Sequence, residues 1–244
     1  MIEVNLCLAG LPISCGVRKT DTISFLKGYQ CHVSITMAAA SVSDDLIAAY
    51  HQNDSSVALT AADEFHLLHL VVSNALVPFQ RCVFHGTAFL WRDKAWLFSA
   101  PSGTGKTTQF RQWRRLYRDE VSIINGDKPV LQFCDDGTIM VHPSPWRGKE
   151  RMGSNLTAPL GGIIYLQQGK ENVIERMNTH DAALPIYRQF LFLPEKGETI
   201  HQVCQMEDRL LRIVPLWKLV NKGDAQSAKL THDTLVKWLD HHDV

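Results

Sequence analysis

The chain has 244 residues, 45% of them hydrophobic, enough for one large domain or one domain with a smaller companion. Its 25 basic and 25 acidic residues cancel, so no overall field favours a nucleic acid or an anionic membrane as partner. No apolar run approaches the ~18 residues of a membrane span, and the start of the chain is acidic, unlike a secretory signal. The six cysteines are scattered, which is typical of reduced thiols. We therefore expect a cytoplasmic protein with no membrane segment.

Residues 1–76 carry weaker signals and are predicted to form a small N-terminal α+β region. The expected elements are strands at Ile2–Leu8 and His32–Met37 and a short helix at Ser41–Tyr50. A clearer helix begins near Thr60, because Thr60 to Asp63 is close to a capping box and apolar residues then recur at helical spacing. Pro78 is expected to close this helix.

Residues 77–244 are predicted to form one α/β domain. Two apolar runs, Val83–Trp91 and Ala95–Ala100, indicate a hairpin that leads directly into a glycine-rich loop, and a helix follows at Thr107–Leu116. Further expected strands are Val121–Asn125, Val130–Cys134, Thr138–His142, Gly162–Gln167 and Val173–Met177. Further expected helices are Asp181–Leu191, Gln202–Leu211 and His232–Leu239, with Arg212–Val220 extended. This mixture favours an α/β fold with a mixed sheet over a purely parallel one.

The glycine-rich loop is the most specific motif. It reads Ala100-Pro101-Ser102-Gly103-Thr104-Gly105-Lys106-Thr107, which fits the P-loop pattern except that alanine stands at the first glycine. The two glycines let backbone N–H groups approach phosphate oxygens, and the following helix points its positive end at the anion. The predicted phosphate site comprises Ser102, Gly103, Thr104, Gly105, Lys106, Thr107 and Thr108.

Two side chains of this loop have distinct predicted tasks. Lys106 brings a full positive charge to the β- and γ-phosphates, and the hydroxyl of Thr107 is suited to ligate Mg²⁺. ATP and Mg²⁺ are therefore the predicted ligands. Because alanine tolerates positive φ poorly, Ala100 predicts that the chain enters the loop at a slightly different backbone angle.

The order of motifs around the loop resembles the HPr kinase/phosphorylase family, whose nucleotide site is shared with ATP-dependent phosphoenolpyruvate carboxykinase. In that family a His-Gly pair opens the hairpin, the glycine-rich loop follows, and an aspartate ends the next strand. This chain supplies His85-Gly86, the loop and Asn125-Gly126-Asp127 in that order. Ser144–Lys149 and Ala158–Leu166 resemble segments of HPr-kinase-related proteins found outside sugar-transport regulation. The likeness spans roughly residues 83–219 and implies a P-loop core of this type.

The resemblance implies roles for Asp127 and His85. It implies that Asp127 binds Mg²⁺ and takes the proton from the acceptor hydroxyl; the alternative is a turn aspartate before Pro129. His85 is a candidate for a hydrogen bond to the transferring phosphoryl group or for proton transfer, since imidazole titrates near neutral pH. The alternative for His85 is a structural role. Lys128 stands where the family often has a second aspartate, which leaves one carboxylate of the family pattern missing.

The loop from Trp146 to Lys149 is a candidate substrate contact. Arg147 and Lys149 carry charge that can stabilise the transferring phosphoryl group or hold an anionic substrate beside Trp146. The alternative is a solvated basic loop. A second basic stripe follows the P-loop on its helix: Arg111, Arg114, Arg115 and Arg118. Overall neutrality and the lack of interleaved aromatic residues favour a solvated face over a nucleic-acid site there.

These features predict an ATP- and Mg²⁺-dependent kinase that phosphorylates a hydroxyl. The acceptor is a Ser or Thr of a small protein or peptide, or a small molecule. HPr itself is not expected, because the family's N-terminal domain and its long signature after the core are absent. The resemblance implies a homo-oligomer.

Two alternatives stay open. One is an enzyme that removes phosphate from a phosphoserine by phosphorolysis or hydrolysis. The other is a non-catalytic nucleotide-binding module, which Lys128 beside Asp127 favours. A carboxykinase is not expected, because the chain is too short for the usual substrate domain.

Overall fold

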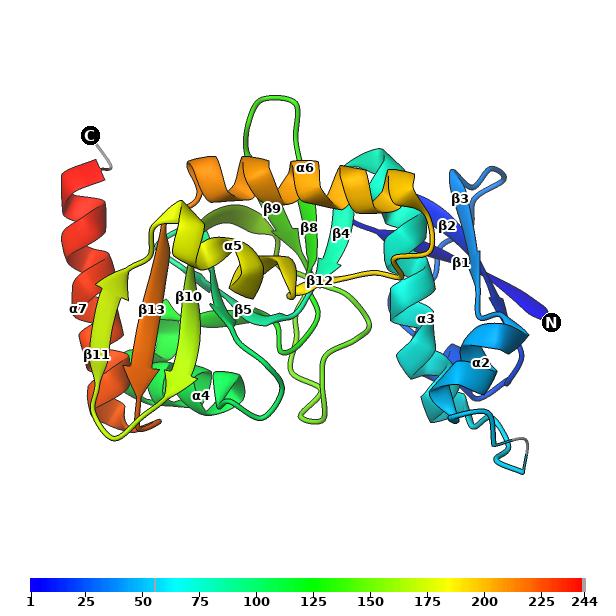
Figure 1. Cartoon of the computed structure of the whole chain (residues 1–244), viewed down its shortest axis with the longest axis horizontal. Helices are drawn as coiled ribbons and strands as arrows, with labels where there is room; N and C mark the ends of the chain where they lie inside the picture. The colour runs from blue at the N-terminus through cyan, green and yellow to red at the C-terminus, as the bar shows by residue number, and fades with distance from the viewer. Residues whose placement is uncertain (55, 243–244) are drawn as a thin grey trace.

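The computed structural model describes residues 1–54 and 56–242, which form a small and a large sheet (Figure 1). The small sheet has the order β1-β2-β3, with bounds β1 Ile2–Leu8, β2 Leu11–Val17 and β3 Ala38–Ser41. Ala9 and Gly10, both at positive φ, turn β1 into β2. The predicted strand at Ile2–Leu8 is confirmed. The one at His32–Met37 is wrong, because these residues lie outside any strand and the strand that follows, Ala38–Ser41, lies parallel to β2.

Three helices belong to this N-terminal part: α1 Thr22–Phe25, α2 Asp44–Tyr50 and α3 Ala61–Leu76. The predicted capping box is present, with Thr60 and Asp63 each accepting a bond from the other's backbone N–H. A short 3-10 helix, Val77–Phe79, contains Pro78 and ends α3 as expected. Figure 1 shows α3 between the small sheet and the rest of the molecule. The apolar face of α3 therefore joins the two parts of the chain.

The large sheet has ten strands. Their bounds are β4 Arg81–Phe84, β5 Gly86–Trp91, β6 Lys94–Ser99, β7 Ser122–Asn125, β8 Val130–Phe133, β9 Ile139–His142, β10 Ala158–Gln168, β11 Val173–Arg176, β12 Phe190–Leu191 and β13 Leu216–Asn221. The main path runs β12-β4-β8-β9-β10-β6-β5-β7, and β13 pairs with both β10 and β11. Only the pairs β10·β6 and β10·β13 are parallel. The sheet is therefore mixed, as predicted.

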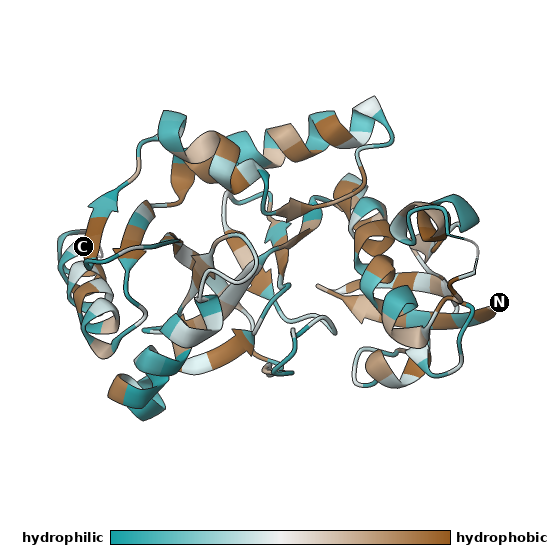
Figure 2. Ribbon diagram, turned by 60° about the horizontal axis from the view of Figure 1, so that its bottom comes forward, coloured by the Kyte–Doolittle hydropathy of each residue, from teal (hydrophilic) through white to brown (hydrophobic). Residues whose placement is uncertain are grey.

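Helices cover both faces of the large sheet. They are α4 Lys106–Tyr117, α5 Thr179–Tyr187, α6 Gly197–Ile213 and α7 Ala225–His242. The α6 residues Val203, Met206 and Leu210 pack with α5 on one face, whereas α4 and α7 pack on the other around four buried tryptophans. Hydrophilic and hydrophobic bands alternate along α6, as expected for a helix with one buried side (Figure 2).

Several predicted boundaries need correction. The helix predicted at Asp181–Leu191 begins at Thr179 after an Asn178 cap and ends at Tyr187, because Phe190–Leu191 pairs with β4 instead. The segment predicted as extended from Arg212 stays helical to Ile213 before β13 begins. His85 interrupts the predicted strand Val83–Trp91, which becomes β4 and β5. All six cysteines are free of disulfides, and within residues 1–54 and 56–242 no helix is long and apolar enough to cross a membrane.

Candidate phosphate-binding site

The glycine-rich loop connects the end of β6 to the start of α4. Gly103 and Gly105 have φ values of 80° and 106°, which favour glycine, whereas Ala100 keeps a φ outside this region. A Cβ added at either glycine would meet no heavy atom within 4 Å, so open space lies in front of the loop. Gly105 is the N-cap of α4, which directs the positive end of a 12-residue helix at that space. This geometry suits a bound phosphate.

Lys106 is the first residue of α4 and is buried. Its Nζ donates to the backbone carbonyls of Ala100 at 2.8 Å and Pro101 at 3.2 Å, so the side chain folds back along the loop. Burial lowers the pKa of Lys106 to about 8; the negative charge of Asp127 opposes this shift and the positive charge of Lys128 adds to it. Lys106 therefore lies within electrostatic reach of both residues.

A tight turn after β7 places Asp127 at the edge of the sheet where β6 ends and the glycine-rich loop begins. The buried side chain of Asn125 holds this turn, because its Oδ1 accepts the backbone N–H groups of Asp127 at 2.9 Å and Lys128 at 2.8 Å. Its Nδ2 donates to the carbonyl of Ser144 at 3.0 Å. Both ends of the Asn125 amide are thus used to position the turn that carries Asp127.

His85 lies between Asp127 and Gln189. Its Nε2 is 3.5 Å from Oδ1 of Asp127, and its Nδ1 is 3.2 Å from Oε1 of Gln189. Gln189 donates through Nε2 to the carbonyl of Pro185 at 3.0 Å, which leaves Oε1 to accept the Nδ1–H of His85. With Nδ1 protonated, Nε2 donates to Asp127 only in the imidazolium form. The ring is therefore held with Nε2 facing the carboxylate.

Asp127 also forms an ion pair with Lys128, whose Nζ contacts Oδ2. Burial would raise the pKa of Asp127, but the hydrogen bond from His85 and the charge and hydrogen bond of Lys128 outweigh it. The pKa therefore lies well below its usual range and Asp127 is a carboxylate at neutral pH. Both of its oxygens have a cationic or hydrogen-bonding partner.

The Trp146–Lys149 loop packs against this turn. The backbone carbonyl of Trp146 accepts the N–H of Lys128 at 3.1 Å, and a Cβ added at Gly148 would lie 3.0 Å from Cβ of Asp127. Lys149 is exposed at the end of this loop. The loop and Asp127 are thus fixed relative to each other.

The Trp146 and Arg147 side chains turn toward the N-terminal part of the chain. Trp146 is buried, donates from Nε1 to the carbonyl of Phe65 at 2.8 Å and stacks on the Phe65 ring. Arg147 donates to the hydroxyl of Tyr29 at 3.1 Å and lies 5.5 Å from the centre of that ring. The Trp146 ring is occupied by packing, and the substrate contacts of this loop stay a prediction.

The α3 helix brings two histidines toward the site, which the sequence did not indicate. His69 is buried beside Trp146, with 6.1 Å between ring centres, and burial lowers its pKa to about 3 with a further contribution from the charge of Lys128. His66 also interacts electrostatically with Lys128 and Asp127. Both histidines therefore lie within electrostatic reach of the Asp127–Lys128 pair.

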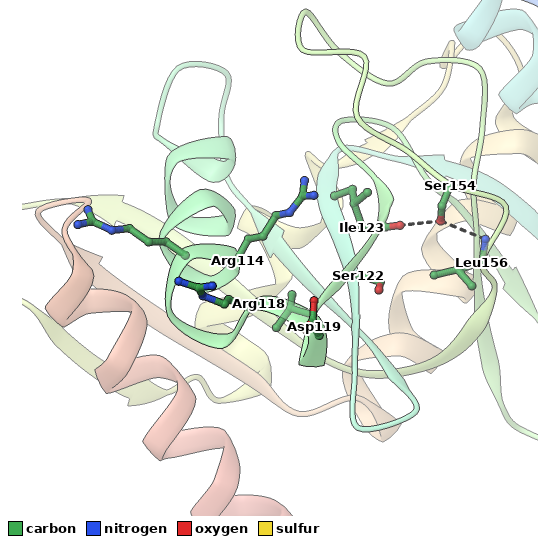
Figure 3. Close-up of a pocket in the computed structure, with 9 residues that line it drawn as sticks. Arg114, Arg118, Asp119, Ser122, Ile123, Ser154 and Leu156 are labelled. Atoms are coloured by element: carbon green, nitrogen blue, oxygen red, sulfur yellow. Dashed lines mark hydrogen bonds between the residues drawn. The ribbon is translucent and has the colours of Figure 1, made fainter.

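A pocket of about 690 Å³ lies away from the loop, between the end of α4 and β7. Exposed Arg114 and Arg118 form one wall, and Ser122, Ser154 and Leu156 belong to the other (Figure 3). The distance from Lys106 to Arg118 is about 18 Å along α4. Arg118 at the far end of the stripe is therefore separate from the predicted phosphate site, whereas Arg111 lies nearer to it and pairs with Glu150 at 2.6 Å.

Thr107 and Asp127 are the predicted ligands of a magnesium ion. Mg²⁺ prefers oxygen ligands and is commonly held by one or two carboxylates together with substrate phosphates and water. Thr107, in the first turn of α4, and Asp127 supply a hydroxyl and a carboxylate at the same edge of the sheet. In the part of the chain that the structure describes, no group of three or more His, Cys, Asp or Glu side chains could hold a metal alone.

Comparison with known proteins gives a distant likeness in structure. No family description and no curated protein matches the sequence. Among solved structures, the Hpr(Ser) kinase/phosphatase from Coxiella burnetii is similar, with 9% sequence identity and a TM-score of 0.33. The match covers 64% of this chain and 93% of that one.

Proposed function

We propose that this protein is a Mg²⁺-dependent kinase that transfers the γ-phosphoryl group of ATP to a hydroxyl. The observation that carries the proposal is the loop, in which two glycines at positive φ precede a buried lysine at the start of α4. It supports phosphate binding because backbone N–H groups, helix dipole and ammonium act on the same anion. The acceptor would be a small protein, a peptide or a small molecule.

In this proposal the loop amides and Lys106 hold the β- and γ-phosphates, and Thr107 with Asp127 holds Mg²⁺, which supplies charge neutralisation. Asp127 accepts the proton of the acceptor hydroxyl, and His85 orients the carboxylate or hydrogen bonds to the phosphoryl group. Arg147 and Lys149 contribute positive charge from the adjacent loop. Each task is of the kind that phosphoryl transfer requires, namely positioning and electrostatic stabilisation.

The test uses ATP labelled on the γ-phosphate, Mg²⁺ and an extract of the source cells. Label should move from ATP to a protein, peptide or small-molecule fraction, and separating these fractions identifies the acceptor class. Lys106→Ala should weaken Mg-ATP binding at least about tenfold, equal to ~1.4 kcal/mol. If the wild-type protein binds neither ATP nor another triphosphate, the proposal is wrong.

The Lys128–Asp127 ion pair supports a second candidate, a nucleotide-binding module without turnover. The Lys128 ammonium group contacts Oδ2 of Asp127, an oxygen that would be needed to bind a metal or to accept a proton from the acceptor hydroxyl. Retained Mg-ATP binding with neither label transfer nor ATP hydrolysis would favour this candidate. Orthophosphate-driven release of pyrophosphate from a phosphorylated acceptor would instead favour the phosphorolytic enzyme.

A further inference from the structure

A second pocket lies directly beside the phosphate loop. It has a volume of about 350 Å³ and is lined by Thr104, Gly105, Thr108, Gln168, Gly169, Asn221, Lys222 and Gly223. Three segments distant in sequence thus meet there: the loop after β6, the end of β10 and the end of β13. The volume lies within the range of about 300–1,000 Å³ that is common for small-molecule sites.

The parallel strands explain why this pocket forms. Tyr165 of β10 pairs with Ser99, the last residue of β6, and β10 continues to Gln168, which pairs with Asn221. Three residues of β10 therefore extend beyond β6 by about 10 Å. They form a wall beside the loop, and the Nε2 atom of Gln168 is 3.4 Å from the carbonyl of Gly103. Crevices at the carboxyl ends of parallel strands are the common ligand sites of open α/β sheets.

The rim of the pocket is held by hydrogen bonds. Buried Asn221 accepts the N–H of Gly223 at 2.9 Å and donates to the carbonyl of Gln167 at 3.2 Å. Asn172 accepts the N–H of Lys222 at 2.9 Å, which joins the loop after β10 to the loop after β13. Gln112 of α4 donates to the carbonyl of Gly223 at 3.3 Å. The pocket is therefore preformed, so a ligand has little ordering cost to overcome.

The pocket and Asp127 lie on opposite sides of the loop. Asp127 follows β7, on the β5 side of β6, and its carbonyl accepts the N–H of Gly86 at 2.9 Å. The pocket lies on the side of β10 and β13. A triphosphate whose γ end faces Asp127 and Lys106 must therefore direct its α-phosphate toward Thr108 and its remaining part toward this pocket.

We infer that the pocket beside Gln168 and Lys222 binds the nucleoside part of the nucleotide. This inference rests on the proposed function, since it assumes a triphosphate at the loop. Main-chain groups of Gly169 and Gly223 lie against the nucleoside, and the Gln168 amide and Lys222 ammonium hydrogen bond to its polar atoms. A Cβ added at Gly169 would lie 2.2 Å from Cγ1 of Val220, so this wall needs a glycine.

Calorimetric titration with Mg-ATP, Mg-GTP and Mg-tripolyphosphate tests the inference. The wild-type protein should bind at least one nucleotide about tenfold more tightly than tripolyphosphate. Gln168→Trp, which fills the pocket from an exposed position, should remove this advantage, so that nucleotide and tripolyphosphate bind this variant with equal affinity. Lys222→Trp should do the same from the other wall.

The matched control is Gln167→Trp, because adjacent strand residues point to opposite faces and Gln167 does not line the pocket. It should bind all three ligands like the wild type. If wild-type protein binds tripolyphosphate as tightly as both nucleotides, or if folded Gln168→Trp and Lys222→Trp keep the nucleotide advantage, the inference is wrong and the proposed function survives. If none of the three ligands binds, the proposed function itself fails.

Discussion

The Nε2 atom of His85 lies 3.5 Å from Oδ1 of Asp127, at the edge of the sheet where the phosphate loop begins. The two residues are 42 positions apart in the sequence and come together because β5 and β7 pair antiparallel. Gln189 holds the imidazole through its contact with Nδ1, on the ring edge away from Asp127. Asn125 holds the turn that carries the Asp127 carboxylate. The pair is therefore held rigidly from both sides.

Replacing Asp127 should leave nucleotide binding intact but slow the transfer of the phosphoryl group. Asp127→Asn keeps the shape of the side chain but removes the charge that holds Mg²⁺ and accepts the proton. We expect nucleotide binding to persist and label transfer to fall by a factor of about 10²–10⁴. Full turnover in Asp127→Asn would refute the assigned role.

Replacing Gln189 should affect the reaction through His85 alone. Gln189→Leu removes the acceptor of the Nδ1–H, so the ring loses its fixed orientation, and we expect turnover to fall about tenfold. His85→Ala should cost about 10² in turnover, and the double variant should be no worse than His85→Ala. Additive losses in this cycle would mean that Gln189 acts independently of His85.

Replacing Lys128 should strengthen metal binding. The ammonium group competes with a cation for Oδ2 of Asp127, so Lys128→Ala should lower the Mg²⁺ concentration for half-maximal ATP binding by at least about threefold. Lys229→Ala, at an exposed position of α7, is the control for general loss of positive charge. An unchanged Mg²⁺ requirement in Lys128→Ala would show that the metal does not use Asp127.

The affinity for ATP should depend on the protonation of Lys106. Its pKa is lowered to about 8 in the free protein, and bound phosphate stabilises the charged form and raises it. Affinity is therefore constant well below pH 8 and falls by up to about tenfold per pH unit above it, until the pKa of the complex is reached. Calorimetry near pH 8 in buffers of different ionisation enthalpy should detect proton uptake on binding. Lys106→Arg, which stays charged, should lose this dependence.

Trp146 should matter for stability. Trp146→Ala removes a buried ring between α3 and the site and should destabilise the protein by about 3–5 kcal/mol, measured by urea unfolding. Trp146→Phe keeps most of the ring but removes the hydrogen bond from the indole N–H to the carbonyl of Phe65, a carbonyl within α3, at a cost of about 0.5–1.5 kcal/mol. Equal stability of both variants and the wild type would show that this contact does not hold the two parts together.

The sequence predicted the parts of the site that depend on local chemistry. Alternating glycines before a lysine require one backbone shape, so the loop and α4 were predictable, although α4 begins at Lys106 rather than Thr107. His85 and Asp127 were predicted from the order of motifs, and the structure brings their side chains to 3.5 Å from each other. Gln189 was not, because it lies outside every motif and reaches His85 only through the pairing of β12 with β4.

The strands that the sequence did not predict also depend on pairing between distant segments. Phe190 and Leu191 look helical in their local context, and their pairing with β4 is a contact across more than 100 residues. Leu11–Val17 contains Pro12 and Gly16, which weaken the strand pattern, yet it is the central strand of the small sheet. Single-sequence patterns do not contain such long-range pairing. The predicted boundary between residues 76 and 77 stays a prediction.

The hydrophobic cluster around α3 bears on how this chain could be divided in the laboratory. It combines residues of β1, β2 and α3 with Val83, Val130, Trp146 and Leu191 of the later part. A fragment starting at residue 77 would expose these four side chains to water and lose the anchor of the loop beside Asp127. Such a fragment should be prone to aggregation, so excision at this position is a poor route to a minimal phosphate-binding protein.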